Sequence, residues 1–587
     1  MKKLISIFSV LLMMLSHLAA AQDIKVSGSV TDANGPVAGA FVVVKGTTNG
    51  TVSDLDGNYS ITAPSGAVLE FSCMGYVSQE VPVAGQSVIN VVLKEDNEIL
   101  ADAVVLGYGV ATKKKDLSAA VGVVSNPDAL SARPVSSVEG MLQGQIAGVS
   151  ISSDGGDPTS APNVVIRGQG SQNSEQVLWV VDGIPGAPIA SLNDIESIVV
   201  LKDAASAAIY GAQSGAGGVI LVTTKKGGKE GLSVNYDGVY GVRQATKLIQ
   251  SLNAEEAIQM RKLSYANAGL SLPDAWNPEK NSWIKTTRTN WMDEVFRTAF
   301  YNRNSVSVNY NSDKLQNRLT FSNDANDGVL VGTYNKKTGI HYTGVFTINK
   351  WVKLTEDLTW TQVNQRSVNT SSPENGVLIN AIFMPQSAEA YAKDGSFGGI
   401  VPAEQAQWAS AHGDSINPLR LCLADTNYNK SNSLWTTTGL EIGNIVPGLK
   451  FNSRFTYAVE SGFSKIFTPR RLELGKPVDN NFLDYASNRE ERWKTENTLT
   501  YDKTFKKHSV GALLSTTADH FYGRYLNVQG QNFGDESVYL QYLANAGSVK
   551  GEDSFSGNDA NLAIVARASY SYDDRYFVTA SWRRDYA

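Results

Sequence analysis

From residue 231 onward the chain carries a period-two alternation of apolar and polar residues that few folds can accommodate. The alternation comes in segments of about ten residues, separated by turn-forming sequence. Eleven such segments can be counted, at Leu232–Arg243, Asn304–Tyr310, Asn317–Asn323, Thr338–Ile348, Val352–Gln362, Leu434–Ile442, Leu449–Val459, Lys494–Lys503, Ser509–Thr517, Ala563–Tyr572 and Tyr576–Trp582. Because such strands have one apolar and one polar face, we expect residues 231–587 to form an antiparallel transmembrane β-barrel.

The connections between these segments alternate in length. Short turns near 311–313, 349–350, 447–448, 506–507 and 573–574 alternate with long stretches near 244–300, 363–433, 460–493 and 518–562, and with a modest one near 324–337. Bacterial barrels alternate short periplasmic turns with long extracellular loops, whereas a soluble β-sandwich has no reason to do so. After residue 21 no window reaches 18 consecutive apolar residues, so any membrane insertion must use strands.

The first residues have the pattern of a targeting signal. Lys2 and Lys3 precede an apolar run from Leu4 to Leu18, and three alanines follow at 19–21. A basic start, a short apolar stretch and small residues at the cleavage point are typical of a secretory signal peptide. The apolar run is too short for a membrane anchor, which needs about 20 residues. We therefore predict that residues 1–21 are a signal peptide for export.

Residues 24–95 contain short strand-like runs separated by turn signals. Seven or so strands in this length predict a small Greek-key β-sandwich. The stretch Asp54–Asn58 invites a calcium-site interpretation, but the third acidic ligand, the glycine at position six and the closing glutamate of an EF-hand are missing. A hairpin turn at Asp56-Gly57 explains the stretch better. Since the domain contains no histidine, we expect a binding or spacer module.

Residues 96–115 are predicted to be a linker that carries a short apolar strand. The strand consists of Ala103, Val104, Val105, Leu106, Gly107, Tyr108 and Gly109. Its pattern fits two roles equally well: pairing with the edge of another protein's sheet, or serving as an ordinary first strand of the next domain.

Residues 116–228 predict an α/β unit with tight glycine turns. The pattern indicates a short helix at Ser137–Gln143 and strands that include Ile195–Leu201. Gly168-Gln169-Gly170 lacks the third glycine of a dinucleotide-binding fingerprint, and Gly227-Gly228 lacks the spacing of a P-loop. The sequence therefore predicts no nucleotide cofactor.

The composition excludes several classes of function. With 51 Lys and Arg against 57 Asp and Glu, the net charge of −6 is mild for 587 residues and does not indicate a nucleic-acid partner. Five histidines and two cysteines are too few for a disulfide framework or a multi-ligand zinc site. The histidines are scattered, and no catalytic motif occurs. We expect no enzyme, no catalytic residue, no metal and no cofactor.

Several motifs resemble those of one protein family. The segments Val180–Pro185, Asp194–Ala205, Ala208–Gly211 and Gly218–Gly227 are together similar to the plug domain of the SusC/RagA family of TonB-dependent outer-membrane receptors. The residues that carry this plug motif are Asp182, Gly183, Glu196, Lys202, Asp203, Tyr210, Gly211 and Gly218. Residues 212–216 depart from the family, which usually has an arginine and one residue fewer there.

The resemblance extends to both sides of the plug motif. Asp54–Ile61 and Gly75-Tyr76 resemble the family's N-terminal carboxypeptidase-regulatory-like domain, and Ala103–Gly109 is similar to its TonB box. Asn290–Thr298 resembles the segment before its second barrel strand. The similarity to a TonB box favours the edge-pairing role of the linker strand.

The resemblance implies a function in nutrient uptake at the outer membrane of a Gram-negative cell. Members import oligosaccharides or oligopeptides, and a SusD-like surface lipoprotein closes the extracellular face. TonB, driven by an inner-membrane motor, pairs with the box and displaces the plug, and no chemistry is done on the substrate. Two alternatives remain: a non-transporting surface receptor or signal transducer, and an inactive truncated fragment of such a transporter.

The expected fold class is mainly β, with a small β-sandwich, an α/β plug and a barrel. The barrel strand count poses a problem of closure, because the resemblance implies about twenty-two strands. An open sheet leaves two edges of unpaired backbone groups in lipid, at several kcal/mol for each group, and bacterial single-chain barrels have even strand numbers. We therefore predict a product truncated at its C-terminus, with roughly the second half of the barrel missing.

Overall fold

The computed structural model divides into two compact units, residues 1–103 and 104–587. It describes residues 23–586, with gaps at 33–34, 38–39, 46, 48, 55, 73–78, 94–102, 106–110, 114–120, 125–129, 131–134, 136, 153–156, 161, 169–176, 203–206, 208–209, 212–216, 228–229, 444 and 574.

The first unit is a β-sandwich. Its strands are β1 (Asp23–Thr31), β2 (Phe41–Val44), β3 (Gly50–Val52), β4 (Asn58–Pro64), β5 (Val68–Ser72), β6 (Gln79–Pro82) and β7 (Val91–Val92). They form a sheet of order β4-β1-β7 and a sheet of order β3-β2-β5-β6. Alternate residues of each strand enter a shared core, in which Tyr59 of β4 packs edge-on against Phe71 of β5. The seven described strands confirm the predicted number.

The acidic stretch of this unit forms a turn. Oδ1 of Asp54 accepts hydrogen bonds from the backbone N–H groups of Asp56 and Asn58, at 3.0 and 2.8 Å. Gly57 has a φ of 76°, which glycine adopts at little cost. The carboxylate of Asp54 thus stabilises the backbone of the turn before β4, as the hairpin interpretation predicts.

The predicted linker carries two short strands, β8 (Ala103–Val105) and β9 (Ala111–Lys113). The plug that follows is a small α/β structure. Its elements are β10 (Val121–Val123), α3 (Val138–Leu142), β11 (Val149–Ser152), β12 (Asn163–Ile166), β13 (Leu178–Val181), β14 (Ile184–Pro185), η3 (Leu192–Asp194), β15 (Ile195–Leu201) and β16 (Val219–Thr224). Five strands make a mixed sheet of order β10-β15-β16-β13-β14. Apolar residues of β15 and β16 pack on α3 through Met141 and Leu142, which are fully buried.

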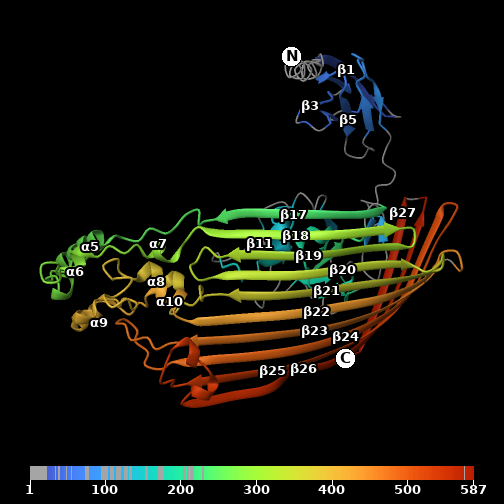
Figure 1. The fold of residues 1–587 in the computed structure, drawn as a ribbon. Coiled ribbons are helices and arrows are strands. Elements are labelled where there is room, and N and C mark those ends of the chain that lie inside the picture. Colours follow the sequence, from blue (N-terminus) through green and yellow to red (C-terminus); the bar gives the residue numbers. More distant parts are fainter. Residues whose placement is uncertain are drawn as a thin grey trace, which may run out of the picture. The chain divides into compact units, whose positions relative to one another are not determined.

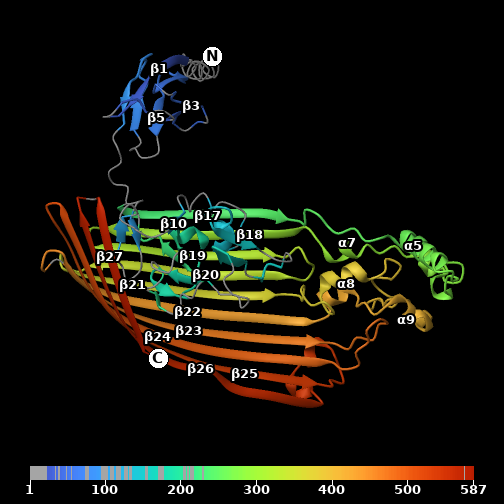
Figure 2. The same cartoon turned by 180° about the vertical axis from the view of Figure 1, so that it is seen from behind.

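A sheet of eleven antiparallel strands follows the plug (Figures 1 and 2). The strands are β17 (Gly231–Arg243), β18 (Ala299–Ser312), β19 (Leu315–Asp327), β20 (Tyr334–Thr347), β21 (Val352–Arg366), β22 (Thr426–Gly443), β23 (Leu449–Thr468), β24 (Phe482–Phe505), β25 (His508–Gln531), β26 (Ser548–Tyr572) and β27 (Tyr576–Tyr586). Each pairs with the next in sequence, and among the described residues β17 and β27 are the edge strands. Each of the eleven predicted segments overlaps one of these strands.

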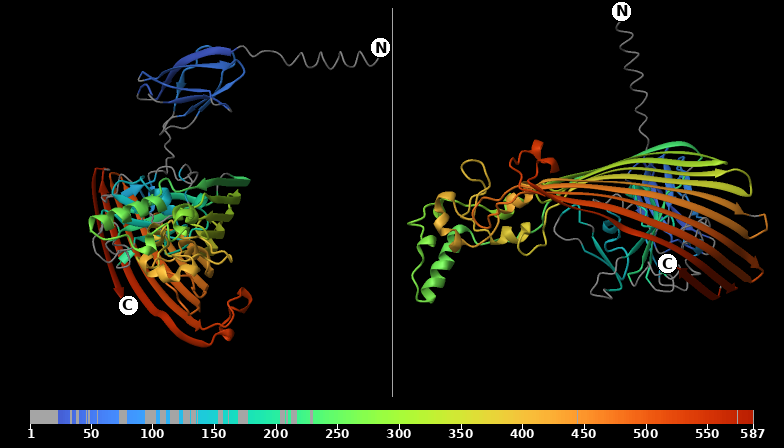
Figure 3. Two further views of the ribbon diagram at one scale, coloured as in Figure 1. Left: turned by 90° about the vertical axis from the view of Figure 1, so that its left-hand side faces the viewer. Right: turned by 90° about the horizontal axis from the view of Figure 1, so that it is seen from below.

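The two faces of this sheet differ as the alternation predicts. The plug lies on the concave face (Figure 3). On β18 the exposed outer side chains include Phe300, Val306, Val308 and Tyr310, and the buried inner ones include Arg303, Ser305, Ser307 and Asn309. The inner polar residues are buried because the plug covers them, so the sheet has an apolar outside and a polar, protein-filled inside.

Two predicted loops are wrong in extent. The stretches 460–493 and 518–562 lie mostly in strands, because the β23–β24 hairpin stays paired to Thr468 and Phe482 and the β25–β26 hairpin to Gln531 and Ser548. Only residues 469–481 and 532–547 connect these strands. The modest stretch near 324–337 is likewise shortened by β19 and β20. Backbone pairing continues where the side chains stop alternating, so the period-two signal marks only part of each strand.

Helices gather at one end of the long sheet (Figure 1). They are α5 (Ala254–Asn267), η5 (Asp274–Trp276), α6 (Trp283–Thr286), α7 (Trp291–Val295), α8 (Val377–Phe383), η6 (Ala403–Trp408), α9 (Ala409–His412), α10 (Pro418–Leu423), η7 (Val538–Leu540) and η8 (Leu543–Asn545). Residues 244–298 and 367–425 share an apolar core around the fully buried Trp291, Ile284 and Cys422, and we call them the loop domain. Of the helices in the described part of the chain, none is long and apolar enough to cross a membrane.

Candidate functional site at the plug–barrel interface

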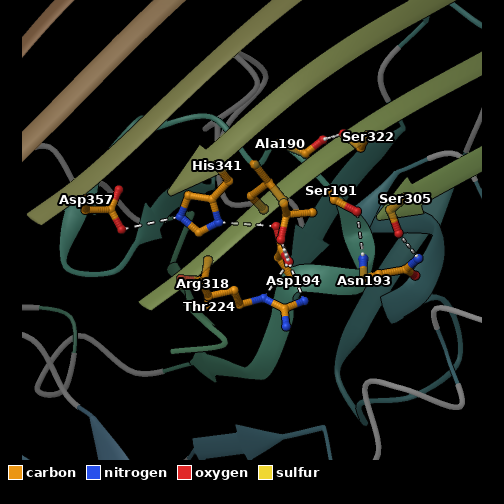
Figure 4. Close-up of polar contacts among 12 residues, drawn as sticks. Ala190, Ser191, Asn193, Asp194, Thr224, Ser305, Arg318, Ser322, His341 and Asp357 are labelled. Atoms are coloured by element: carbon orange, nitrogen blue, oxygen red, sulfur yellow. Dashed lines mark hydrogen bonds and ion pairs between the residues drawn. The ribbon is translucent and has the colours of Figure 1, made fainter. Parts of the chain in front are cut away.

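The plug presents a buried carboxylate to the barrel wall. A single 3₁₀ turn, η3, begins after Ser191, whose Oγ accepts the N–H of Asn193 at 3.3 Å. The turn ends at Asp194, where the chain enters β15. This geometry places Asp194 against β19 and β20 with only 1% of the residue exposed (Figure 4).

Side chains from neighbouring barrel strands hold this carboxylate. Arg318 of β19 donates to Oδ1 from Nε and Nη2, at 3.1 and 2.8 Å, and Thr320 donates to the same oxygen at 2.7 Å. His341 of β20 places Nδ1 3.2 Å from Oδ2, and its Nε2 lies 3.4 Å from Oδ2 of Asp357 on β21. We call these five residues the Asp194 network (Figure 4). It links one plug residue to three consecutive barrel strands.

The network keeps Asp194 ionised. Burial by itself raises the pKa of a carboxyl group, since the charged form loses hydration. The hydrogen bond from His341 and the charges of His341 and Arg318 outweigh burial and hold the pKa of Asp194 below its ordinary value. Breaking a buried, hydrogen-bonded ion pair by removing one partner typically costs about 3–5 kcal/mol. The network is therefore a strong but local attachment.

Further polar contacts join the plug to the barrel wall. They are Asn193 Nδ2 to Ser305 Oγ at 2.8 Å, Ser322 Oγ to Ala190 O at 2.9 Å, Arg303 Nη1 to Val135 O at 3.1 Å, Asn335 Nδ2 to Pro158 O at 3.2 Å, Arg454 Nη2 to Asp182 O at 2.7 Å, and Lys337 Nζ to Ile189 O. In every one except the first, a barrel side chain donates to a plug backbone carbonyl. These further contacts therefore depend more on the position of the plug backbone than on the identity of the plug side chains.

One of the predicted plug-motif residues, Asp182, lines the same small cavity as three members of the Asp194 network. Its carboxylate accepts the Thr224 hydroxyl at 2.7 Å and the Thr224 N–H at 3.1 Å, which joins the ends of β13 and β16. Burial and the charge of nearby Asp357 raise the pKa of Asp182. Asp182, Asp194 and His341 line one small cavity of about 10 Å³, close to the size that holds a single water molecule.

The other predicted motif residues lie within the plug. Lys202 Nζ donates to the carbonyl of Ala147 at 2.7 Å. Glu196 is exposed on β15, and Tyr210 is buried. Gly183, Gly211 and Gly218 have φ values of 82°, 72° and 84°, in the left-handed region that glycine tolerates. Asp203 lies outside the described residues. In the described part of the chain these residues serve turns and packing, and their functional role stays a prediction.

The predicted TonB-box strand is described only in part. Ala103–Val105 forms β8, which pairs with β9 in a sheet of two strands. Leu106, Gly107, Tyr108 and Gly109 lie outside the described residues. The extended backbone of β8 is compatible with both roles considered for this strand.

Sequence reasoning missed the barrel half of the site. Arg318, Thr320 and His341 stand at inward positions of predicted strands, where charged and polar residues are ordinary in a barrel. The available signal for this half of the site was that an arginine and a histidine occupy the buried face of neighbouring strands. Their convergence on Asp194 depends on how the plug sits in the barrel, which no local pattern encodes.

Comparisons with known proteins agree with this architecture. Residues 26–106 match the family model of the CarboxypepD_reg-like domain, and residues 113–219 match that of the TonB-dependent receptor plug domain. The RagAB peptide importer in its "open-open" state has a similar structure, with a TM-score of 0.68 at 21% identity over 82% of this chain and 56% of that chain. At this identity the likeness shows the fold alone.

Curated relatives extend the similarity along the whole chain. The TonB-dependent receptor P3 of Formosa agariphila is 30% identical over 590 residues, covering 100% of this chain and 56% of the relative. The TonB-dependent receptor SusC of Bacteroides thetaiotaomicron is 39% identical over 350 residues, covering 56% of this chain and 33% of that protein. The chain thus spans about half the length, or less, of these relatives.

These relatives are named as receptors, which supports the prediction that the chain is not an enzyme. The first matched domain ends within the predicted TonB-box strand and the second begins after it, and the plug is followed by a wide antiparallel sheet with a polar inner face. By its domains, its relatives and its fold, the chain is SusC/RagA-like and is similar to TonB-dependent receptors over about half of their length.

Proposed function

We propose that the chain acts in TonB-dependent import of oligosaccharides or oligopeptides through the outer membrane, with a SusD-like surface lipoprotein as partner. The observation that carries this proposal is the buried polar attachment of the plug to the barrel wall. A plug held on the polar face of a barrel blocks the lumen, so passage of a solute requires that the plug move or unfold. The names of the relatives and the matched plug domain support the same function.

The chemistry of the attachment suits mechanical release. The described contacts around η3 are hydrogen bonds and ion pairs, and water can replace each of them as the plug moves away. The expected route of the force is the linker strand Ala103–Gly109, paired with periplasmic TonB. Because the contacts around η3 lie within a short stretch, Ile189–Asp194, a pull that unravels this stretch would release them in succession, while the contacts at Val135, Pro158 and Asp182 would have to part separately.

A reversible cross-link between plug and barrel tests the proposal. A Cβ atom placed on Gly339 of β20 lies 3.1 Å from Cβ of Ala190 and 2.8 Å from its carbonyl oxygen, so a disulfide, which needs about 3.5–4.5 Å between Cβ atoms, forms here if the two backbones separate by a few tenths of an ångström or more. We expect Ala190→Cys with Gly339→Cys, in a background where Cys73 and Cys422 are alanine, to stop uptake of fluorescent oligosaccharide and oligopeptide mixtures by cells under oxidising conditions. Reductant should restore uptake.

Each single cysteine variant in the same background is the matched control and should transport under both conditions. Uptake that persists when mass spectrometry shows the cross-link to be complete would contradict the proposal, because the plug would not need to leave the wall. Binding at the cell surface without TonB-dependent uptake in the reduced state would instead support a receptor that does not transport.

A further inference from the structure

A pocket that is separate from the plug lies between the loop domain and the connection from β23 to β24. Its volume is about 660 Å³, within the range of about 300–1,000 Å³ typical of small-molecule sites. One wall is the segment 389–404, the second is the segment 470–474 between β23 and β24, and Arg420 of α10 also lines it. We call it the loop pocket.

The walls of the loop pocket are built to a fixed shape. The backbone N–H of Ile400 donates to Leu474 O at 2.8 Å and joins the two segments. A Cβ on Gly399 would lie 2.7 Å from the backbone nitrogen of Leu474, so the walls meet more closely than any other residue would allow. Arg420 Nη2 donates to the carbonyls of Pro469 and Arg470 at 3.1 and 2.7 Å. A preformed pocket loses little conformational entropy when a ligand enters.

An aromatic surface lines the loop pocket. Tyr391 is 48% exposed, and its ring stacks on that of Phe397 with the centroids 5.6 Å apart and the planes 25° from parallel. The backbones of these two residues pair across a turn, and the guanidinium of Arg420 lies 5.8 Å from the centre of the Phe397 ring. A flat ring fixed in this way offers an apolar face beside open space, which suits the C–H face of a sugar ring.

The charges of the pocket are balanced in a way that favours a neutral ligand rich in hydroxyl groups. Lys393 pairs with Glu404 at 3.0 Å, Arg420 with Glu473 at 2.9 Å and Arg470 with Glu536 at 2.9 Å, so each cation of the lining already has a carboxylate. Two further carboxylates, Glu389 and Asp394, take part in no ion pair among the described residues. Oδ1 of Asp394 already accepts the N–H and the hydroxyl of Ser396, at 3.0 and 2.6 Å, so its Oδ2 is the acceptor that a ligand would use.

The lining of the loop pocket therefore has carboxylate oxygens that can accept further hydrogen bonds, whereas each of its cations is already paired with a carboxylate. Carboxylate oxygens accept hydrogen bonds from hydroxyl groups. An acidic sugar or the C-terminus of a peptide would have to displace an existing partner before it could pair with a cation.

We propose that the loop pocket binds a neutral oligosaccharide, whose sugar ring packs on Tyr391 and whose hydroxyl groups donate to Glu389 and Asp394. This inference rests on the proposed import function and narrows its substrate class from oligosaccharides or oligopeptides to neutral oligosaccharides.

The test begins with the class of ligand. The purified full chain is applied to an array of neutral α- and β-linked oligosaccharides of glucose, galactose, mannose and xylose, beside arrays of uronic-acid oligosaccharides and of peptides. The proposal expects binding to one or more neutral oligosaccharides. Selective binding to peptides or to acidic sugars, or binding to no neutral oligosaccharide, overturns it.

Variants then locate the site by calorimetric titration with the best neutral oligosaccharide. Loss of an aromatic stacking contact should make Tyr391→Ala bind about tenfold more weakly, whereas Tyr391→Phe keeps the ring and should stay within about twofold. Tyr539→Ala is the matched control, since Tyr539 is 88% exposed on η7 outside the pocket, and it should bind normally. Equal affinity of Tyr391→Ala and the parent chain overturns the assignment of the site, and unchanged thermal melting of each variant excludes misfolding.

Failure of this inference can be told apart from failure of the proposed function. If cells take up peptides in a TonB-dependent manner, and the cross-link between Ala190 and Gly339 abolishes that uptake, the import function is supported and a neutral oligosaccharide is rejected as the substrate. If the chain binds the sugar, the binding depends on Tyr391 and no uptake occurs, the assignment of the loop pocket is supported and the import function is rejected.

Discussion

The plug is attached to the barrel wall chiefly through individual polar residues, beside one buried apolar contact of Ile184 with Trp435 and Ala458, and Asp194 is the most deeply buried of the residues that carry a charge. Its carboxylate is the counter-charge of Arg318, which is itself 90% buried at the side chain, and it meets His341 as well. In such a site the loss of one charge matters more than the loss of one hydrogen bond, since the partners stay in the protein without solvent.

Replacing Asp194 with asparagine should loosen the plug. We expect the free energy that separates the plug from the wall to fall by about 3–5 kcal/mol, because Arg318 and His341 keep their burial and lose their counter-charge. Hydrogen exchange of the β15 and β16 amides measures the change. Glu196→Gln is the control, since Glu196 is exposed on β15, two residues after Asp194, and its exchange should match the parent. Unchanged protection in Asp194→Asn would show that the network carries no net attachment.

A second residue, His412, makes the loop domain sensitive to acid. It is 5% exposed, packs on Trp276 with the ring centres 3.8 Å apart and the planes tilted by 31°, and places Nε2 3.0 Å from the carbonyl oxygen of Ala275. Burial, partly offset by the Ala275 contact and aided by the charge of Arg261, lowers the pKa of His412 from 6.5 to about 4. The folded state therefore favours the neutral ring.

The sign of the pH dependence follows from this lowered pKa. The contribution of His412 to stability is complete above pH 6.5 and is lost as the pH falls toward about 4, because the unfolded chain takes up the proton first. Tryptophan fluorescence of thermal unfolding should show the loop domain melting earlier across this interval. His412→Phe should flatten the profile, whereas His508→Gln, at a turn far along the sequence, should keep it. If the loop domain of the His412→Phe variant loses as much thermal stability at low pH as that of the parent, His412 is not the group responsible for the acid sensitivity.

At the scale of elements, the sequence predicts which strands exist better than where they end. Asn317–Asn323 was expected on the strength of its alternation, and β19 runs from Leu315 to Asp327. The ends were missed because backbone pairing persists where polar residues occupy both faces, as in Arg489–Arg492 of β24. The same limit applies to the site: local pattern places Arg318 and Thr320 on the inner face of β19, and only the docking of η3 brings Asp194 to them.

Within the plug, the start of β16 depends on a residue without a side chain. Gly218 has a φ of 84°, and a Cβ there would lie 2.9 Å from Cδ1 of Ile166 and 3.2 Å from the carbonyl oxygen of Leu201. Gly218→Ala should therefore destabilise the plug by more than the roughly 1–3 kcal/mol of backbone strain alone.

Gly144→Ala is the matched control, because Gly144 has a φ of 74° with no atom within 4 Å of its built Cβ, so it reports strain without the clash. Limited proteolysis of the plug measures the two effects. Equal protection of the two variants would show that the contact with Ile166 relaxes at no cost.

At the scale of the whole molecule, the proposed membrane location predicts that a charged side chain destabilises the protein more on the outer face of the sheet than on the inner face. Phe321 of β19 is 49% exposed on the outer face, where lipid is expected. We expect Phe321→Arg to weaken folding into lipid vesicles by about 2–4 kcal/mol if its position is near the bilayer midplane. Tyr539→Arg, in the connection between β25 and β26, should fold as the parent does. Folding yields from urea into vesicles provide the measurement, and equal yields for Phe321→Arg and the parent would speak against a lipid-facing β19.

The length of the paired strands sets how far the molecule reaches from the cell. β25 has 24 residues, which corresponds to about 80 Å of extended chain and, at a tilt near 40°, to a height of about 60 Å. The hydrocarbon layer is only about 30 Å thick. In the proposed orientation, roughly half of the β25–β26 hairpin extends beyond the lipid. The hydrogen-bond register between the two strands fixes how far it extends. An antibody or a phage that binds residues 532–547 would therefore meet them at a constant distance from the membrane.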